Sequence, residues 1–188
     1  RQNNRRARFL LAGTFGYFFV TYLFYTAMGM YNAFFLVYVA LAGLSLFGLL
    51  NTLLPIEIEK LPGLFSNHPP TKLTGGFLMF NASMIALMWL GVVVPPLLDG
   101  SLYPEQLQHY TTLIVQGFDL GLLLPLAFVS GWLLFKKHPM GYLAGSTYIV
   151  FLSFMMTALT AKIIAMAMHE LNVMPAIIII PLFNLVAI

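Results

Sequence analysis

Long apolar runs separated by short polar segments make up most of this chain. No charged residue occurs between Phe9 and Ile56. As a single α-helix this run would be about 70 Å long, at ~1.5 Å per residue, which is more than twice the ~30 Å of the hydrocarbon core of a bilayer. The run must therefore fold back on itself. The turn-prone residues 29–32 favour a break there, so the pattern predicts two spanning helices at about residues 9–28 and 33–54.

The remaining apolar runs divide in the same way. Residues 55–72 form a loop because prolines gather there with Glu57, Glu59 and Lys60, and a short acidic loop begins at Asp99. The chain is therefore predicted to be all-α: one polytopic transmembrane bundle over residues 1–188. Its expected spans are about six, at residues 9–28, 33–54, 73–98, 109–135, 141–168 and 171–188. The last span ends without a cap, so we expect further chain beyond it.

Composition supports a membrane protein and excludes several classes. Hydrophobic residues make up 60% of the chain and charged residues 8%, whereas a soluble domain carries about 25% charged residues. A soluble globular enzyme is therefore excluded. Because the sequence has no cysteine, thiol catalysis, thiolate zinc sites, iron–sulfur clusters and disulfides are excluded as well.

Charge placement predicts the topology. Lysine and arginine gather in the N-terminal tail, in the loop that holds Lys60 and Lys72, and at Lys136 and Lys137, which fall on one side of a six-span bundle. The opposite loops carry acidic residues and no Lys or Arg. The positive-inside rule then predicts that both termini are cytoplasmic. The basic tail is read as the flank of a span rather than as a nucleic-acid site, so no nucleic-acid partner is expected.

Four stretches resemble a group of uncharacterised prokaryotic multi-span integral membrane proteins. They are NAFFLVYVAL at residues 32–41, LSLF at 44–47, FDLG at 118–121 with Pro125, and PMGYLA at 139–144. The likeness covers about residues 16–166. It implies a multi-pass protein of the prokaryotic inner membrane, with one or two more spans ahead of Arg1. The group has no known activity, so the resemblance implies no catalytic residue.

Asp119 is the most informative single residue. It lies about ten positions into the span at 109–135, hence roughly 15 Å from the outer end and near the centre of the bilayer. A carboxylate at that depth costs about 2.5–3.5 kcal/mol on insertion scales. Two interpretations stay open. The carboxyl group either ties helices together by hydrogen bonds, or it binds a ligand or handles a proton.

Helical geometry places Asp119 on a polar stripe. At ~100° per residue, His109, Thr112, Gln116 and Asp119 fall within an arc of about 80° on one helix face. The stripe descends from the outer surface to the membrane centre. It predicts an outward-facing polar pocket around Asp119.

Small residues and a proline mark the same helix. Gly117 and Gly121, nearly opposite the stripe, are spaced to let another helix approach closely, and Gly141 with Gly145 repeats the spacing in the next span. Pro125 has no N–H to donate to the carbonyl of Gly121, which leaves an acceptor free below Asp119.

Three other polar residues are candidates for the same pocket. Lys162 lies about 9 Å from the outer end of its span; it either extends to the interface or pairs with Asp119, which would keep the carboxylate ionised. His169 lies on the face of Lys162, two turns further out. Asn81 lies near mid-depth and Trp89 nearer the outer side of the same span, and both either line the cavity or hydrogen-bond between helices.

Sequence motifs for catalysis or metal binding are absent. His169-Glu170 begins like a zinc-protease helix, but Val173 stands where the second histidine belongs. No phosphate-binding glycine loop and no nucleophile elbow occurs. We therefore expect no catalytic residue, no metal and no cofactor.

Three functions remain. The first is binding or transport of a small solute or proton in the pocket around Asp119. The second is a non-catalytic sensor domain or accessory subunit, and the third is an intramembrane enzyme with Asp119, His109 or Glu170 as acid or base. The expected partners are the lipid bilayer, a small-molecule ligand, and a second copy or another membrane subunit.

Overall fold

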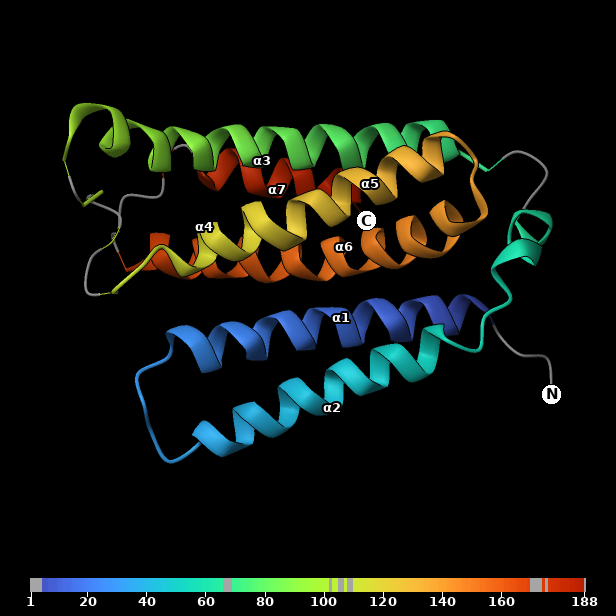
Figure 1. Cartoon of the computed structure of the whole chain (residues 1–188), viewed down its shortest axis with the longest axis horizontal. Coiled ribbons are helices and arrows are strands. Elements are labelled where there is room, and N and C mark those ends of the chain that lie inside the picture. The colour runs from blue at the N-terminus through green and yellow to red at the C-terminus, as the bar shows by residue number, and fades with distance from the viewer. Residues whose placement is uncertain are drawn as a thin grey trace. The chain divides into compact units, whose positions relative to one another are not determined.

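The computed structural model describes residues 5–65, 69–101, 103–104, 107, 110–169, 174 and 176–187 of the chain. Every regular element in these ranges is helical, as Figure 1 shows. The long elements are α1 (Arg5–Met28), α2 (Phe35–Leu53), α3 (Thr71–Asp99), α4 (Ile114–Phe118), the π-helical turn η4 (Asp119–Leu123), α5 (Leu124–Phe135), α6 (Pro139–Met168) and α7 (Ala176–Ala187). Two short 3₁₀ turns, η1 (Ile58–Lys60) and η2 (Pro62–Leu64), precede α3.

Five helical segments are long and apolar enough to cross a membrane. They are α1, α2, α3, the continuous stretch Ile114–Phe135 that contains α4, η4 and α5, and α6. In a bilayer only helices or closed barrels satisfy their own backbone groups, which explains why such apolar runs become helices. The prediction of an all-α, multi-pass bundle is therefore confirmed. The sixth expected span is represented by α7, which has 12 residues between Ala176 and Ala187.

The break between the first two helices occurs where the turn-prone residues predict it. α1 ends at Met28 and α2 begins at Phe35. Between them the Asn32 side chain donates to the carbonyl of Met30 at 2.9 Å and accepts from the N–H of Phe34 at 2.8 Å. These local bonds compete with a continuous helix and so stabilise the turn.

The bounds of the third span agree with the expectation, whereas the start of the fourth is wrong. α3 runs from Thr71 through Pro95 and Pro96 to Asp99, within two residues of the expected span at 73–98, and Gly100 caps it with a φ of 77°. The pattern predicts a fourth span from residue 109, but its helix begins at Ile114.

The chain forms two compact units, each with its own packing. Unit 1 contains Arg1–Tyr22, Val39–Ile56 and Ser146–Ile188. Unit 2 contains Leu23–Tyr38 and Glu57–Gly145. The expectation of a single transmembrane domain stays a prediction.

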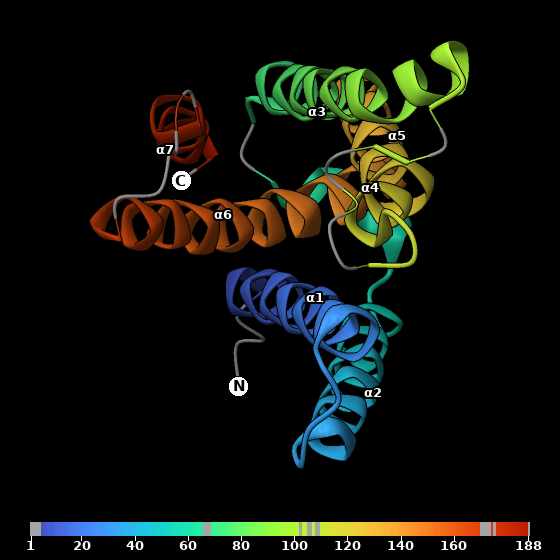
Figure 2. The same cartoon turned by 90° about the vertical axis from the view of Figure 1, so that its left-hand side faces the viewer.

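In unit 1, α6 packs against both α1 and α7. Gly13 of α1 lies directly on Val150 and Phe151 of α6, with no room for a side chain. Hydrogen bonds join α6 to α7: the Ser153 hydroxyl donates to the carbonyl of Ala187 at 2.6 Å, and Figure 2 shows the two helices side by side. Close packing at small residues and hydrogen bonds from hydroxyl groups thus hold these helices together, whereas burial of apolar surface from water holds a soluble core together.

In unit 2, α3 and α5 cross where two glycines meet. A Cβ on Gly75 would lie 2.5 Å from the carbonyl oxygen of Gly131, and one on Gly131 would lie 2.7 Å from the carbonyl oxygen of Gly75. The backbones therefore touch at this point. Leu78 of α3 and Ser130 of α5 are almost fully buried beside the crossing.

The two glycine pairs that the sequence marks as close-packing sites differ in how closely other residues approach them. Gly141 lies against the backbone of Leu133 and Leu134, and a Cβ on Gly145 would meet the Leu134 side chain at 2.9 Å, so the predicted close packing of this pair is confirmed. The prediction for Gly117 and Gly121 is wrong. A Cβ on either would meet no described residue within 4 Å, and both glycines are exposed. The close crossing of this span with α3 is made at Gly131 instead.

Candidate binding pocket

A pocket of about 400 Å³ lies in unit 2, beside the beginning of α4. This volume is within the range of small-molecule sites, ~300–1,000 Å³. The wall comes from α3, from the segment that leads into α4, and from α4 with the first turn of η4. The described residues that line it are Val93, Tyr103, Pro104, Leu107, Thr111, Thr112, Leu113, Gln116, Gly117 and Leu120.

Gln116 contributes the buried polar group of this wall. Its side chain is 9% exposed, and the structure gives it no hydrogen bond to any described residue. Among the described residues no side-chain nitrogen or oxygen is both sealed from solvent and unpaired, so the Gln116 amide must face accessible space. An amide offers two donors and one acceptor, and buried amides nearly always use them. The wall of the pocket therefore holds an amide with unused hydrogen-bonding capacity.

The threonine predicted to share the helix face of Gln116 lies elsewhere. Thr112 precedes α4 and is exposed, so the predicted helical stripe from residue 109 down to Asp119 is not a single helix face. The chain instead bends ahead of Ile114, whose N–H donates to the Thr112 carbonyl at 3.1 Å. This bend still places Thr112 in the wall of the pocket together with Gln116. His109 lies outside the described residues.

Asp119 is half-buried and has a partner on another helix. The indole N–H of Trp89 in α3 donates to its Oδ2 at 2.7 Å. The sequence allowed two roles for Trp89, and this bond between helices is one of them. Asp119 is not among the pocket-lining residues, although Gln116 and Leu120 on either side of it are.

The backbone at Asp119 departs from α-helical geometry. Asp119 begins the π turn η4, and the N–H of Leu124 donates to the Asp119 carbonyl, five residues earlier. Pro125 comes directly after Leu124 and has no N–H of its own. The helix therefore accommodates the missing N–H of Pro125 by widening the turn that precedes it. Single π turns within α-helices are frequent at functional sites.

The three remaining candidates do not line the pocket. Asn81 is buried within α3, at 3% exposure, in unit 2. Lys162 and His169 are exposed and lie in α6 and just after its end, in unit 1, whereas Asp119 lies in unit 2. Pairing of Lys162 with Asp119 stays a prediction.

The sequence pattern does not reveal the apolar part of the wall. Val93, Leu107 and Leu120 carry no chemical signal, because apolar residues occur almost everywhere in this chain. Tyr103 stands out only as a residue near a span end. The one signal that points to the right place is the row of polar residues ahead of Asp119.

Comparison of the chain with protein-family models, with curated proteins and with solved structures finds no match. The class of protein therefore rests on the helices themselves. They define a multi-pass membrane protein of the helix-bundle type.

Proposed function

We propose that this membrane protein binds a small polar solute in the pocket beside Gln116. The observation that carries the proposal is Gln116, a residue that is 9% exposed, lines the pocket and whose amide has no hydrogen-bond partner among the described residues. A solute with a hydroxyl, amide or carboxylate group satisfies it. Thr111 and Thr112 supply two further hydroxyls in the same wall.

Asp119 acts in this proposal as a positioning residue. Gln116 is three residues ahead of it, and the Trp89–Asp119 bond fixes the rotation of this stretch against α3. With the bond in place the amide faces the pocket. The π turn supports the same role, because it sets the register between the pocket wall and the close crossing of α3 and α5.

Thermal unfolding of the purified chain in detergent tests the proposal. The probes are three sets of polar solutes: amino acids, sugars and polyols. We expect at least one probe to raise the unfolding temperature of the wild type, and Gln116→Met to lose that shift while unfolding normally without a probe. Methionine keeps the length of glutamine and removes the amide. Thr14→Val is the matched control, because the Thr14 hydroxyl donates to its own helix at the Leu10 carbonyl and Thr14 is not among the pocket-lining residues.

The proposal fails on either of two results. One is that no probe shifts the wild type and no small molecule co-purifies with it by mass spectrometry. The other is that Gln116→Met responds to every probe as the wild type does. Transport of the solute is a further step of the proposal. It requires uptake of the identified probe by vesicles that contain the wild type and no uptake by those with Gln116→Met.

A further inference from the structure

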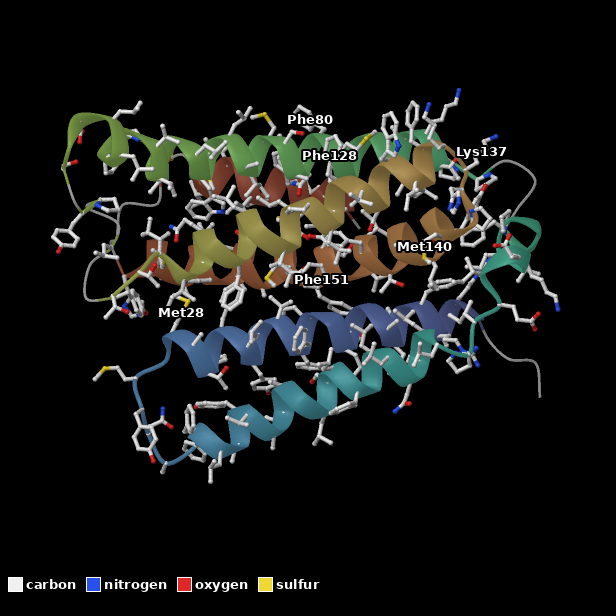
Figure 3. All side chains as sticks on the ribbon, in the orientation of Figure 1. Met28, Phe80, Phe128, Lys137, Met140 and Phe151 are labelled. Atoms are coloured by element: carbon white, nitrogen blue, oxygen red, sulfur yellow. The ribbon has the colours of Figure 1, made fainter. Side chains whose placement is uncertain are left out.

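The turn between α5 and α6 is a closed helix C-cap with lysine in an unusual position. The N–H of Lys137 donates to the Leu134 carbonyl and the N–H of His138 to the Leu133 carbonyl, each at 2.9 Å. This pair of bonds is the Schellman arrangement, whose cap residue adopts a left-handed backbone. Lys137 adopts it, with a φ of 56°. Figure 3 shows the residue at this turn.

Glycine is the usual residue at such a cap, because a Cβ raises the energy of the left-handed conformation. Lys137 is the only described residue other than glycine with a positive φ. The chain thus holds a cation where a glycine would be less strained. Strained positions of this kind often mark functional residues.

Other cations lie at the same end of unit 2. Lys136 lies over the ring of Trp132, with Nζ 4.9 Å from the ring centroid. Lys72 lies in the first turn of α3, three residues before Gly75, and Gly75 packs against Gly131 and Phe135 of α5. The crossing therefore brings the beginning of α3 to the end of α5. We call Lys72, Lys136 and Lys137 the basic end of unit 2.

None of these lysines has a carboxylate partner within the described part of the chain. The one salt bridge found there joins Glu57 to Lys60. The three lysines of the basic end are exposed. The turn itself is held in place, because the N–H of Met140 donates to Nδ1 of His138 at 3.2 Å and the two cap bonds fix the backbone. Three exposed lysines and a tryptophan at the end of two membrane helices, two of the lysines on a turn with a fixed backbone, match a phosphate at the depth of lipid headgroups.

We propose that the basic end of unit 2 binds the headgroup of an anionic phospholipid. The phosphate accepts hydrogen bonds from the ammonium groups of Lys136 and Lys137, and Lys72 adds a third positive charge. The acyl chains lie along the exposed apolar side chains of α3 and α5 near this end, such as Leu73 and Trp132. This proposal does not depend on the pocket at Gln116.

The test titrates the purified full chain in detergent with dioctanoyl phosphatidylglycerol, followed by native mass spectrometry and thermal unfolding. Dioctanoyl phosphatidylcholine is the neutral comparison, and glycerol phosphate is the free-anion comparison. We expect wild type to prefer phosphatidylglycerol and Lys137→Gln to bind it about fivefold more weakly, the effect of roughly one cation near a headgroup. Lys162→Gln is the matched control, because it removes an exposed lysine from α6 in unit 1. It should bind as the wild type does.

A second variant separates lipid binding from folding. Lys137→Gly removes the cation and the strained Cβ together, so we expect it to unfold at a higher temperature than wild type without lipid and still to bind the lipid more weakly. Equal affinity of wild type and Lys137→Gln for phosphatidylglycerol would overturn the proposal. Equal affinity of wild type for phosphatidylcholine would do so too, as would displacement of the lipid by equimolar glycerol phosphate.

Discussion

The indole nitrogen of Trp89 lies 2.7 Å from Oδ2 of Asp119, to which its N–H donates a hydrogen bond. The bond joins α3 to the first residue of the π turn η4, 30 positions further along the chain. A carboxyl group within a membrane helix is costly unless it has a partner inside the protein. Trp89 supplies that partner. The pair therefore fixes which side of the fourth spanning segment faces α3.

Removing the indole N–H should weaken this contact. Trp89→Phe keeps an aromatic ring and leaves Asp119 without its donor, so we expect a loss of about 1 kcal/mol in unfolding free energy, as for other interhelical hydrogen bonds in membranes. Asp119→Leu should cost a similar amount, and the double variant should cost less than the two losses added together. Unfolding in mixed micelles with increasing dodecyl sulfate measures all three. Strict additivity would show that the two side chains do not interact.

The glycine crossing of α3 and α5 predicts a sharp difference between neighbouring positions. Gly75→Ala would place a methyl group 2.5 Å from the Gly131 carbonyl oxygen, whereas Gly76→Ala would meet no described atom within 4 Å. We expect the first to lose about 1–3 kcal/mol by overpacking and the second to be neutral or slightly stabilising, because alanine favours helix. Thermal unfolding of both variants in detergent checks this. Equal stability would mean that the helices do not meet at Gly75.

Pro125 should control the π turn. Pro125→Ala restores an N–H that can reach the Gly121 carbonyl, and η4 then has reason to relax into an α-helix. An α-helical turn holds about one residue fewer than a π turn. This change would therefore rotate α4 by ~100° relative to α5. Gln116 would then turn away from the pocket. We expect the variant to lose the probe-induced shift, and to gain no unfolding temperature from the restored N–H because the rotation also separates Asp119 from Trp89. Retention of the full shift would show that the π turn is not needed for binding.

Much of the fold could be predicted from the sequence, for simple reasons. Apolar runs of bilayer length and charged loops between them give the rough positions of the five described helices that are long enough to cross a membrane. Asn32 marks the first turn because its side chain bonds to the backbone nearby. The close packing at Gly141 results from small residues at helical spacing.

The details of the candidate site could not be predicted in the same way. In a soluble helix the apolar face shows which side is buried, but here α3 is apolar all round, so its rotation toward Asp119 is not encoded in a hydrophobic stripe. The sequence does not show that α4 begins at Ile114 rather than at residue 109, because Thr111 and Thr112 are tolerated in membrane helices. Pro125 predicts a free carbonyl, but nothing in the sequence says how the neighbouring backbone adjusts to it.

Water access to position 116 is the most direct test of the pocket. The chain has no cysteine, so single cysteines can be placed at Gln116, at Thr112 and at Leu126, a residue of α5 that is 49% exposed and does not line the pocket. The reagent is a water-soluble, charged methanethiosulfonate applied to protein in lipid vesicles. We predict fast modification of Gln116→Cys and Thr112→Cys and slow modification of Leu126→Cys, whose side chain would face lipid. Modification of Gln116→Cys as slow as that of Leu126→Cys would contradict a solute pocket at this site.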